Sequence, residues 1–385
     1  MIAYTRCEDS GLGLTIIGWL AVATLAVGLP GCNPATPADA GLRTTAPNLR
    51  VAKEMPLETE LPHMLPVQHL TFSRDGELIL AVDGRAQVAL FSHTSGELLT
   101  SLDGEPELRF ERGNLIKAGL LDDDTAFYLA WNKGLFEIWN IAPTTRRFTH
   151  RFSAAGLDTA AANADYIAHG DAVLNRHTGA LLDGAFLASS LVNIDYQLTD
   201  GDLLFSASPI NRDMVLTDLD EGTQDIWDSS RVHMAAFTSS QRYLVAAGSR
   251  CQVWRLPNPE PVYQCGSRWP LAANVHRIAT HPTEDLFAVY QGKSVRVYAL
   301  DPFRKLLDIK APDQVVHLAL TVNNRLVLAD RKHHLEVWDI ADQTLVGTYA
   351  STSIDTLAAH PTTGDVLIAG DGDRHGLFLL TADAP

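Results

Sequence analysis

The sequence predicts an all-β fold, a β-propeller of eight four-stranded blades. Three observations support this prediction. Short apolar runs alternate with polar turns from Val67 onward. This pattern recurs about every 40 residues, a spacing that is typical of propeller blades. Long amphipathic stretches with helix caps are absent after residue 32. Stacked repeats bury the faces of each sheet against its neighbours, so a chain of this length needs no split into several cores. A ring of seven blades is the alternative.

The repeating unit is four strands long. In His333–Tyr349, apolar residues alternate with polar ones, stop at Ala341–Gln343 and resume, which indicates a hairpin. The preceding segment VVHLALTVNNRLVLADRK supplies two more apolar runs around a turn at Asn323–Asn324. Equivalent units are expected to begin at Val67, Ile116, Leu157, Val192, Val232, Val275, Val315 and Ile354.

The ends of the repeat array predict how the ring closes. The unit that begins at Ile354 stops after three strands, and the segment NLRVAKEMPL precedes the first unit. We expect this segment to supply the missing fourth strand, so that both ends of the array are fastened in one blade. The near-continuous apolar runs FYLAW and LFAVY also fit sheets that are covered on both faces.

Two motifs connect the repeats to known families. FSRDGELILA (Phe72–Ala81) and LEVWDI, with its Trp338–Asp339 pair, resemble the repeats of WD-repeat propellers. The resemblance covers about residues 49 to 385 and implies a propeller fold rather than a particular activity. Thr178–Gly179 and Ser95–Gly96 are similar to turns of quinoprotein propellers, but the tryptophan that should follow them is missing.

The N-terminal segment predicts where the protein works. Residues 11–31 carry no charge and precede Cys32, with Leu29 and Gly31 placed as in a bacterial lipoprotein signal, which this segment resembles. We therefore expect a signal peptide at 1–32, a flexible Pro/Ala-rich tether at 33–48 and a propeller at 49–385. Lipidation of Cys32 would anchor the propeller to a membrane of the bacterial cell envelope, facing the periplasm. Asn33 gives no Asp-type retention signal, which favours the outer membrane. An uncleaved membrane helix is the alternative.

The composition argues against several classes of function. The formal net charge is −16, and removal of residues 1–32 leaves −15. We expect no nucleic-acid partner, because phosphate binding needs concentrated Lys and Arg. The sequence contains no nucleophile elbow, phosphate loop, haem-attachment motif or zinc-protease motif, so no catalytic residue, metal site or cofactor is expected. His333 and His334 are neighbours on a strand and should point to opposite faces.

Four histidines are candidates for a site in the central channel. His69, His233, His276 and His317 all fall in the first strand of a unit, which is the strand that lines the channel in propellers. Such a ring of side chains would suit a metal or an anionic ligand. His233 and His276 directly follow the opening valine, whereas His69 and His317 come one place later. Because side chains alternate along a strand, the two pairs are expected to face opposite ways.

The segment CQVWRLPNPEPVYQC predicts a disulfide between Cys251 and Cys265. Its two halves are the third and fourth strands of one unit, joined by a turn near Asn258. Residues at equal distances from that turn lie opposite each other, which places the two cysteines about 5 Å apart. Pro261 suits an outer strand. Two unpaired cysteines in a packed blade are the alternative.

These features together favour a non-enzymatic scaffold lipoprotein that binds or assembles other proteins of the cell envelope. The alternative is a propeller enzyme, a hydrolase or a quinone-dependent dehydrogenase, with its site in the central channel. A scaffold should crosslink to envelope proteins, whereas an enzyme should carry a small molecule or a metal in the channel.

Overall fold

The structure is a computed structural model. It describes residues 47–57, 64, 66–102, 113–121, 124–152, 160–169, 172–182, 195–199, 201–207, 213–228, 232–248, 250–258, 260–265, 275–370 and 376–381. All of these belong to one compact unit, Thr36–Pro385. The predicted signal peptide with Cys32, and the tether as far as residue 46, lie outside the described residues.

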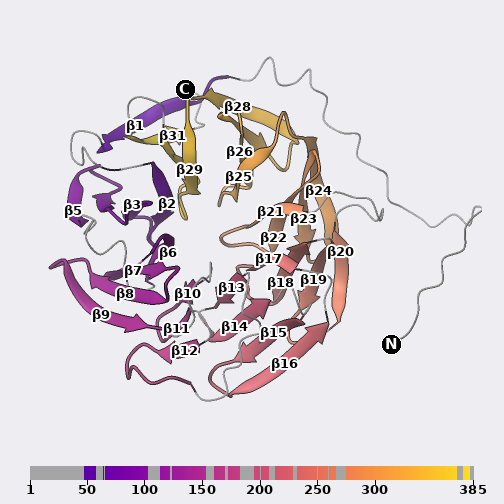
Figure 1. Ribbon diagram of the computed structural model, residues 1–385. Helices are drawn as coiled ribbons and strands as arrows, with labels where there is room; N and C mark the ends of the chain where they lie inside the picture. Colours follow the sequence, from indigo (N-terminus) through magenta and orange to yellow (C-terminus); the bar gives the residue numbers. More distant parts are fainter. Residues whose placement is uncertain are drawn as a thin grey trace, which may run out of the picture. The chain divides into compact units, whose positions relative to one another are not determined.

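The described residues form eight antiparallel sheets arranged as the blades of a propeller (Figure 1). Blade 1 contains β2 (Val67–Phe72), β3 (Leu78–Asp83), β4 (Val88–Ser92) and β5 (Leu98–Leu102). Blade 2 contains β6 (Leu115–Leu120), β7 (Ala126–Trp131), β8 (Leu135–Asn140) and β9 (Thr145–Arg151). Blade 3 contains β10 (Ala160–Ala162), β11 (Tyr166–His169) and β12 (Ala172–Asn175). Blade 4 contains β13 (Asp195–Leu198), β14 (Leu203–Ala207), β15 (Asp213–Asp218) and β16 (Thr223–Asp228).

The second half of the ring is more regular. Blade 5 contains β17 (Val232–Phe237), β18 (Tyr243–Gly248), β19 (Cys251–Arg255) and β20 (Pro261–Cys265). Blade 6 contains β21 (Val275–Thr280), β22 (Leu286–Gln291), β23 (Ser294–Leu300) and β24 (Phe303–Lys310). Blade 7 contains β25 (Val315–Leu320), β26 (Arg325–Asp330), β27 (His334–Asp339) and β28 (Thr344–Ala350). Blade 8 contains β29 (Ile354–Ala359), β30 (Val366–Gly370), β31 (Gly376–Thr381) and β1 (Arg50–Pro56).

The predicted eight-bladed fold is therefore confirmed, with small shifts in the irregular units. Five blades begin at the expected residue, whereas blade 2 begins at Leu115 rather than Ile116. The expected starts Leu157 and Val192 lie outside the described residues, and the described strands there begin at Ala160 and Asp195. Blade 3 has three described strands, and the single bridge from Leu174 to Leu181 marks where an outer strand would begin.

The ring closes through a strand from the N-terminal side of the repeats. β1 pairs antiparallel with β31, with Met55 opposite Leu377, and so occupies the place of the missing fourth strand. Just before β1, the backbone of Leu49 donates to the carbonyl of Thr348 on the outer strand of blade 7. Gly347 makes room for this contact, because a Cβ there would overlap the Leu49 side chain.

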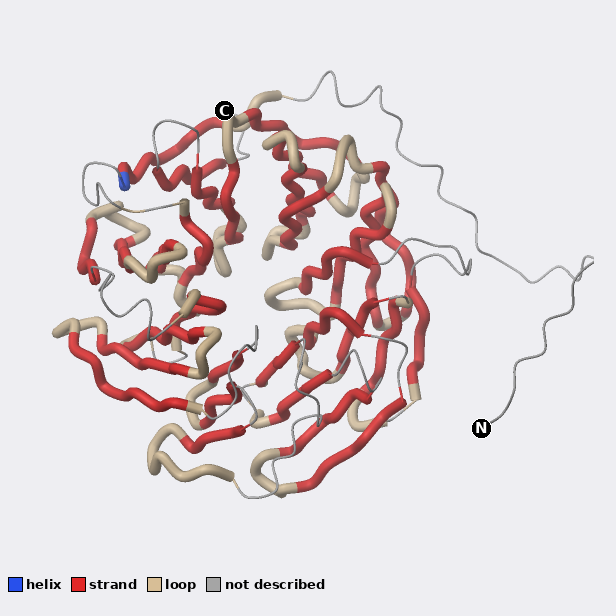
Figure 2. The backbone as a smooth tube through the Cα atoms, in the orientation of Figure 1, coloured by secondary structure: helices blue, strands red, loops and turns tan. Residues whose placement is uncertain are grey.

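The strand order gives the ring two distinct faces. In each blade the first strand is innermost, and the first strands of neighbouring blades contact each other, as β2 does with β6 and with β29. We call the strands of a blade a, b, c and d from the centre outward. Because successive strands are antiparallel, the a–b and c–d turns lie on one face, the a–b face, and the b–c turns lie on the other, the b–c face. Figure 2 shows the strands, joined by these turns, arranged around the centre of the ring.

The apolar core is divided among the interfaces between blades. Eight buried clusters are present among the described residues, and each combines side chains from two adjacent blades. Leu80 of blade 1 packs with Phe127 and Leu129 of blade 2, for example. The b strands contribute to both of their interfaces, which explains why β7, β18 and β22 are buried along their whole lengths.

A recurring aromatic residue marks the same irregularity on the c strands of five blades. Phe91, Trp139, Trp254, Tyr298 and Trp338 all stand at the point where the pairing of the c and d strands shifts by one residue. Four of them are buried, and Trp139 is partly buried. The bulge also changes one expected pairing, because Pro261 stands opposite Trp254 rather than Arg255.

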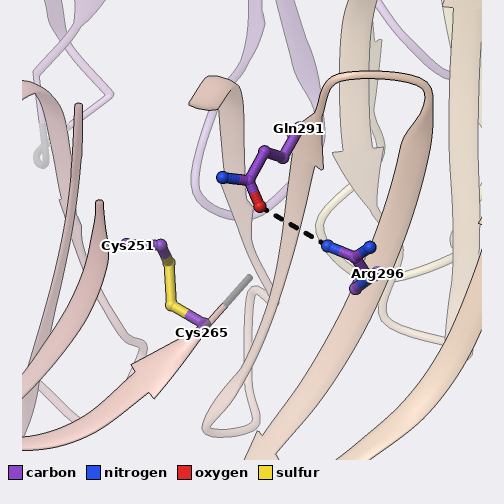
Figure 3. The surroundings of a disulfide bond; sticks show 4 residues. All are labelled: Cys251, Cys265, Gln291 and Arg296. Atoms are coloured by element: carbon purple, nitrogen blue, oxygen red, sulfur yellow. Dashed lines mark hydrogen bonds between the residues drawn. A yellow bond between two sulfur atoms is a disulfide. The ribbon is translucent and has the colours of Figure 1, made fainter. Parts of the chain in front are cut away.

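Cys251 and Cys265 are joined in a disulfide, as the sequence predicts (Figure 3). They are register partners on β19 and β20, and their Cα atoms are 5.0 Å apart. The bond links the c and d strands of blade 5 and lies in the interface with blade 6. On the facing blade, Gln291 accepts a hydrogen bond from Arg296 at 3.5 Å, and Arg296 also pairs with Asp308.

Candidate functional site

The predicted channel histidines occupy two different positions on the a strands. A bulge falls between the first and third residues of β2, β17, β21 and β25. His233 and His276 are the residues that this bulge skips, and both are exposed. His69 and His317 come after the bulge, opposite Val82 and Ala329, and are partly buried. The structure therefore places the four rings in two environments rather than in one uniform set.

Each partly buried histidine has a basic neighbour from the next blade or the one before. Burial, followed by the nearby charge of Lys117, lowers the pKa of His69 to about 4. Burial and then Arg277 also lower the pKa of His317. The described residues contain no group of three or more His, Cys, Asp or Glu side chains that would hold a metal ion. At neutral pH these rings are neutral hydrogen-bonding groups beside a cation.

His333 also acts as a hydrogen-bonding group. Its Nδ1 accepts from the backbone N–H of Ile354 at 3.0 Å, which connects blade 7 to the first strand of blade 8. His334 is 55% exposed and its Nδ1 lies 3.8 Å from Asp330. The two neighbouring rings thus have separate partners. The expectation that both lie on a strand is wrong, because His333 stands in the turn before β27 with a φ of 63° and only His334 belongs to the strand.

On the a–b face, a side-chain acceptor stabilises the first turn of most blades. Ser73 uses its hydroxyl oxygen to accept a hydrogen bond from the backbone N–H of Leu78. The hydroxyl of Thr199 accepts from the N–H of Leu203 in the same way, and that of Thr321 accepts from the N–H of Arg325. Asn163 uses its amide oxygen to accept the N–H groups of Asp165 and Tyr166. His281 and His360 use Nδ1 to accept two N–H groups each. Sequence reasoning missed this shared role because it is carried by four residue types.

The same face holds hydrogen bonds between the turns of adjacent blades. Asn163 donates to the Thr199 carbonyl and to Asp202, both at 2.8 Å, which connects blades 3 and 4. Burial raises the pKa of Asp202 above its usual value. Asn324 of blade 7 donates to Glu284 of blade 6 at 3.1 Å. These contacts hold neighbouring a–b turns in fixed relative positions.

A groove of about 910 Å³ runs across blades 5, 6 and 7 on the a–b face. Its apolar lining includes Leu286, Leu300 and Ile340, which are buried side chains. Its polar lining includes the ion pair of Arg242 with Asp285 at 2.9 Å. Burial alone would raise the pKa of Asp285, but hydrogen bonds from Ser240, Thr238 and Arg242 lower it.

Further polar groups surround the groove. Arg304 and Lys305 come from the start of β24, and Gln343 comes from the c–d turn of blade 7. Gln343 donates to the carbonyl of Leu306 at 3.0 Å and so ties two blades together beside the groove. A buried apolar base with a charged and amide-bearing rim has the composition of a protein-binding surface.

A smaller pocket of about 450 Å³ lies on this face among the a–b turns. Its lining residues come from four blades and include Arg74 of blade 1, Thr199 of blade 4, Phe237 of blade 5 and Pro282 of blade 6.

Among the described residues, no helix has the length and apolar character needed to cross a membrane.

Comparisons with known proteins support the fold. No family model matches the chain, and no curated protein matches its sequence. Among solved structures, the C-terminal WD40 domain of Sif2 is similar, with a TM-score of 0.69 and 12% identity over 88% of this chain and 99% of that one. At this level of identity the likeness concerns architecture alone, and it shows that the chain has the fold of a WD40 propeller.

Proposed function

We propose that this chain is a non-enzymatic protein-binding scaffold of the bacterial cell envelope, anchored to the membrane through a lipid on Cys32. The observation that carries the binding role is the groove across blades 5, 6 and 7. It is built from turns of three blades, and inter-blade hydrogen bonds such as Asn324–Glu284 and Gln343–Leu306 hold those turns. A preformed surface of this kind binds without paying the full cost of ordering loops.

The chemistry of the groove fits a protein segment. Buried Leu300 and Ile340 offer apolar contact, while Arg242, Arg304 and Gln343 supply donors around it. Interfaces between proteins combine an apolar centre with a polar rim in this way. WD40 propellers generally bind protein partners, and this chain shares their architecture.

Two features support a place in the cell envelope. The uncharged segment 11–31 followed by Cys32 resembles a lipoprotein signal. The disulfide in blade 5 is the kind of bond that persists in oxidising compartments such as the periplasm.

If Cys32 carries the lipid, replacing it with alanine abolishes fatty-acid labelling and leaves an uncleaved precursor. Unchanged labelling of Cys32→Ala would contradict the anchor.

Site-specific crosslinking tests the binding role. A photo-crosslinking residue is placed at Gln343, beside the groove, in the full chain expressed in its native membrane. The control is the same residue at Ile226, which is 69% exposed on the outer strand of blade 4. We expect discrete adducts with envelope proteins at Gln343 and few at Ile226. Equal adducts at both positions, or none at Gln343, would contradict the proposal. A small molecule or metal that co-purifies in the channel would instead favour the enzymatic alternative.

A further inference from the structure

The two faces of the propeller carry opposite charge among the described residues. The a–b face is predominantly acidic, and its exposed carboxylates include Asp75, Glu77, Glu97, Asp220, Glu221, Glu260, Glu284, Asp301 and Asp342. The b–c turns carry basic side chains instead. Exposed Lys or Arg side chains occur in the described b–c turns of blades 1, 2, 5, 6 and 7, namely Arg85, Lys133, Arg250, Lys293, Arg331 and Lys332.

The basic character extends inward from these turns. The a strands begin on the same face, and their third residues include Lys117 and Arg277. Arg277 is exposed, and its Nε donates to the carbonyl of Val316 on the next blade, which holds the side chain across the junction of blades 6 and 7. Among the described residues, every b–c turn of blades 1, 2, 5, 6 and 7 thus carries an exposed cation, in a chain whose net charge is −16.

A pocket of about 520 Å³ opens within this basic region, between blades 6 and 7. Lys293 lines it from the b–c turn of blade 6, and Lys310 lines it from the end of β24. His276 and Tyr290 form another part of the lining, with their ring centroids 5.7 Å apart. Asp313 is the acidic residue of the lining, and Lys332 pairs with it at 3.0 Å. Lys293 has no ion-pair partner among the residues that the structure describes.

We propose that the b–c face binds an acidic segment of a partner protein, and that the pocket between blades 6 and 7 receives one of its carboxylate side chains. The Lys293 ammonium would pair with the carboxylate, while the His276 and Tyr290 rings would contact its aliphatic stem. The surrounding b–c turns would then attract the neighbouring acidic residues. This surface is separate from the groove on the a–b face, so the scaffold would hold two partners, or two parts of one partner, on opposite sides.

The charge distribution favours a protein segment over an anionic membrane. Electrostatic interactions are screened beyond about 10 Å at moderate ionic strength. A short acidic segment lying on the b–c face therefore experiences mainly the local cations. A membrane surface is extended, and it would also meet the rest of a strongly acidic molecule. Local complementarity of this kind contributes to the rate and specificity of association.

The experiment measures binding of a fluorescein-labelled hexaglutamate peptide to the full chain by anisotropy at low ionic strength. We expect hexaglutamate to bind the unmodified chain saturably and less tightly as salt is added. A hexalysine peptide should not bind at this pocket. The test variant is Lys293→Glu combined with Lys310→Glu. Reversing the charges of two lysines that line the pocket should weaken binding by about tenfold or more.

The matched control is Arg147→Glu combined with Arg255→Glu, which changes the net charge equally but places both substitutions beside c–d turns, toward the a–b face. It should leave peptide affinity within about twofold, and thermal unfolding should show that both variants remain folded. An equal loss in both double variants would overturn the proposal, because net charge alone would then explain binding. Binding to phosphatidylglycerol vesicles without binding to hexaglutamate would overturn it in favour of a lipid surface. Crosslinking at Gln343 reports the groove separately and should be unchanged by Lys293→Glu.

Discussion

The Nε2 atom of His360 lies 3.2 Å from Nδ1 of His93, across the junction where the last blade meets the first. The edge of Phe72 packs against both rings, with centroid distances of 4.8 Å to His360 and 5.6 Å to His93. Nδ1 of His360 accepts the N–H groups of Thr362 and Thr363, so a neutral ring with its proton on Nε2 satisfies this arrangement. Protonating His360 on Nδ1 would remove an acceptor from the turn.

This junction should lose stability as the pH falls. Burial, then the neighbouring ring, lowers the pKa of His360, and burial, then Lys53, lowers that of His93, although Asp365 and Glu77 oppose both shifts. The unfolded chain therefore binds more protons below the ordinary histidine pKa of about 6.5. The contribution of the two neutral histidines to the free energy of unfolding is therefore fully present above that pH and declines as the pH falls below it. His69 adds to the same decline, down to its folded pKa of about 4.

His360→Asn should make stability less dependent on pH, measured by urea unfolding between about pH 7.5 and about pH 5. Asparagine retains an oxygen that can accept the turn N–H groups, as Asn163 does at the equivalent position of blade 3. The control is His334→Asn, because His334 is 55% exposed. A pH profile unchanged in His360→Asn, or altered equally in the control, would contradict the role of this pair.

The strand that closes the ring should be sensitive to loss of one buried side chain. Met55 on β1 is 1% exposed and packs with Leu377 of blade 8 and Ile79 of blade 1. Met55→Ala should lower the free energy of unfolding by about 2–5 kcal/mol, as for other large-to-small core substitutions. Val51→Ala on the same strand, where the side chain is 41% exposed, should change it by less than about 0.5 kcal/mol. Similar values for both, measured by urea unfolding, would mean that β1 does not hold the ring.

The number of blades was predictable because each unit repeats the same order of apolar runs and turns. The regular units predicted strand starts at Val232, Val275, Val315 and Ile354 that the structure confirms. Blade 3 was harder, because its first strand is Ala160–Ala162, and short alanine side chains give no clear strand signal. The shift at Pro261 was missed because a bulge leaves no pattern in one strand alone.

The candidate sites were less predictable than the fold. Ser73, Asn163 and His360 have the same role in their turns, yet they share only an acceptor atom and not a residue type. Both the groove and the basic pocket are assembled from neighbouring blades, so their shapes depend on how the sheets pack. The histidines of the a strands were visible in sequence, but the bulge that separates His276 from His317 was not.

The disulfide of blade 5 should be present in the mature protein and should stabilise it. Both cysteines are buried and the loop that they close is short, with a sequence separation of 14. In the chain-entropy model such a bond contributes about 3 kcal/mol, so Cys251→Ala with Cys265→Ala should lower the free energy of unfolding by about that amount. Thiol labelling of the denatured, unreduced mature protein provides the direct measurement. Two labelled thiols would rule out the bond, whereas no label would support it.

Blade 2 contains a buried carboxylate, Glu137, that forms an ion pair with Arg146 of the outer strand. Glu137 is 1% exposed at its side chain and accepts hydrogen bonds from Arg146 at 3.1 Å and from Trp131 Nε1 at 3.3 Å. Arg146→Leu should lower the free energy of unfolding by about 2–4 kcal/mol, because a buried charge loses its counter-ion. The magnitude lies below that of a fully buried pair because the Arg146 side chain is 46% exposed.

Adding Glu137→Leu to Arg146→Leu should recover part of that loss, since the uncompensated carboxylate is then gone. Arg147→Leu is the control, because Arg147 is an exposed neighbour on the same strand and should change stability by less than about 0.5 kcal/mol. Urea unfolding of the parent, Arg146→Leu, Glu137→Leu and the double variant completes a double-mutant cycle. Additive losses in the double variant would show that Glu137 and Arg146 do not interact energetically.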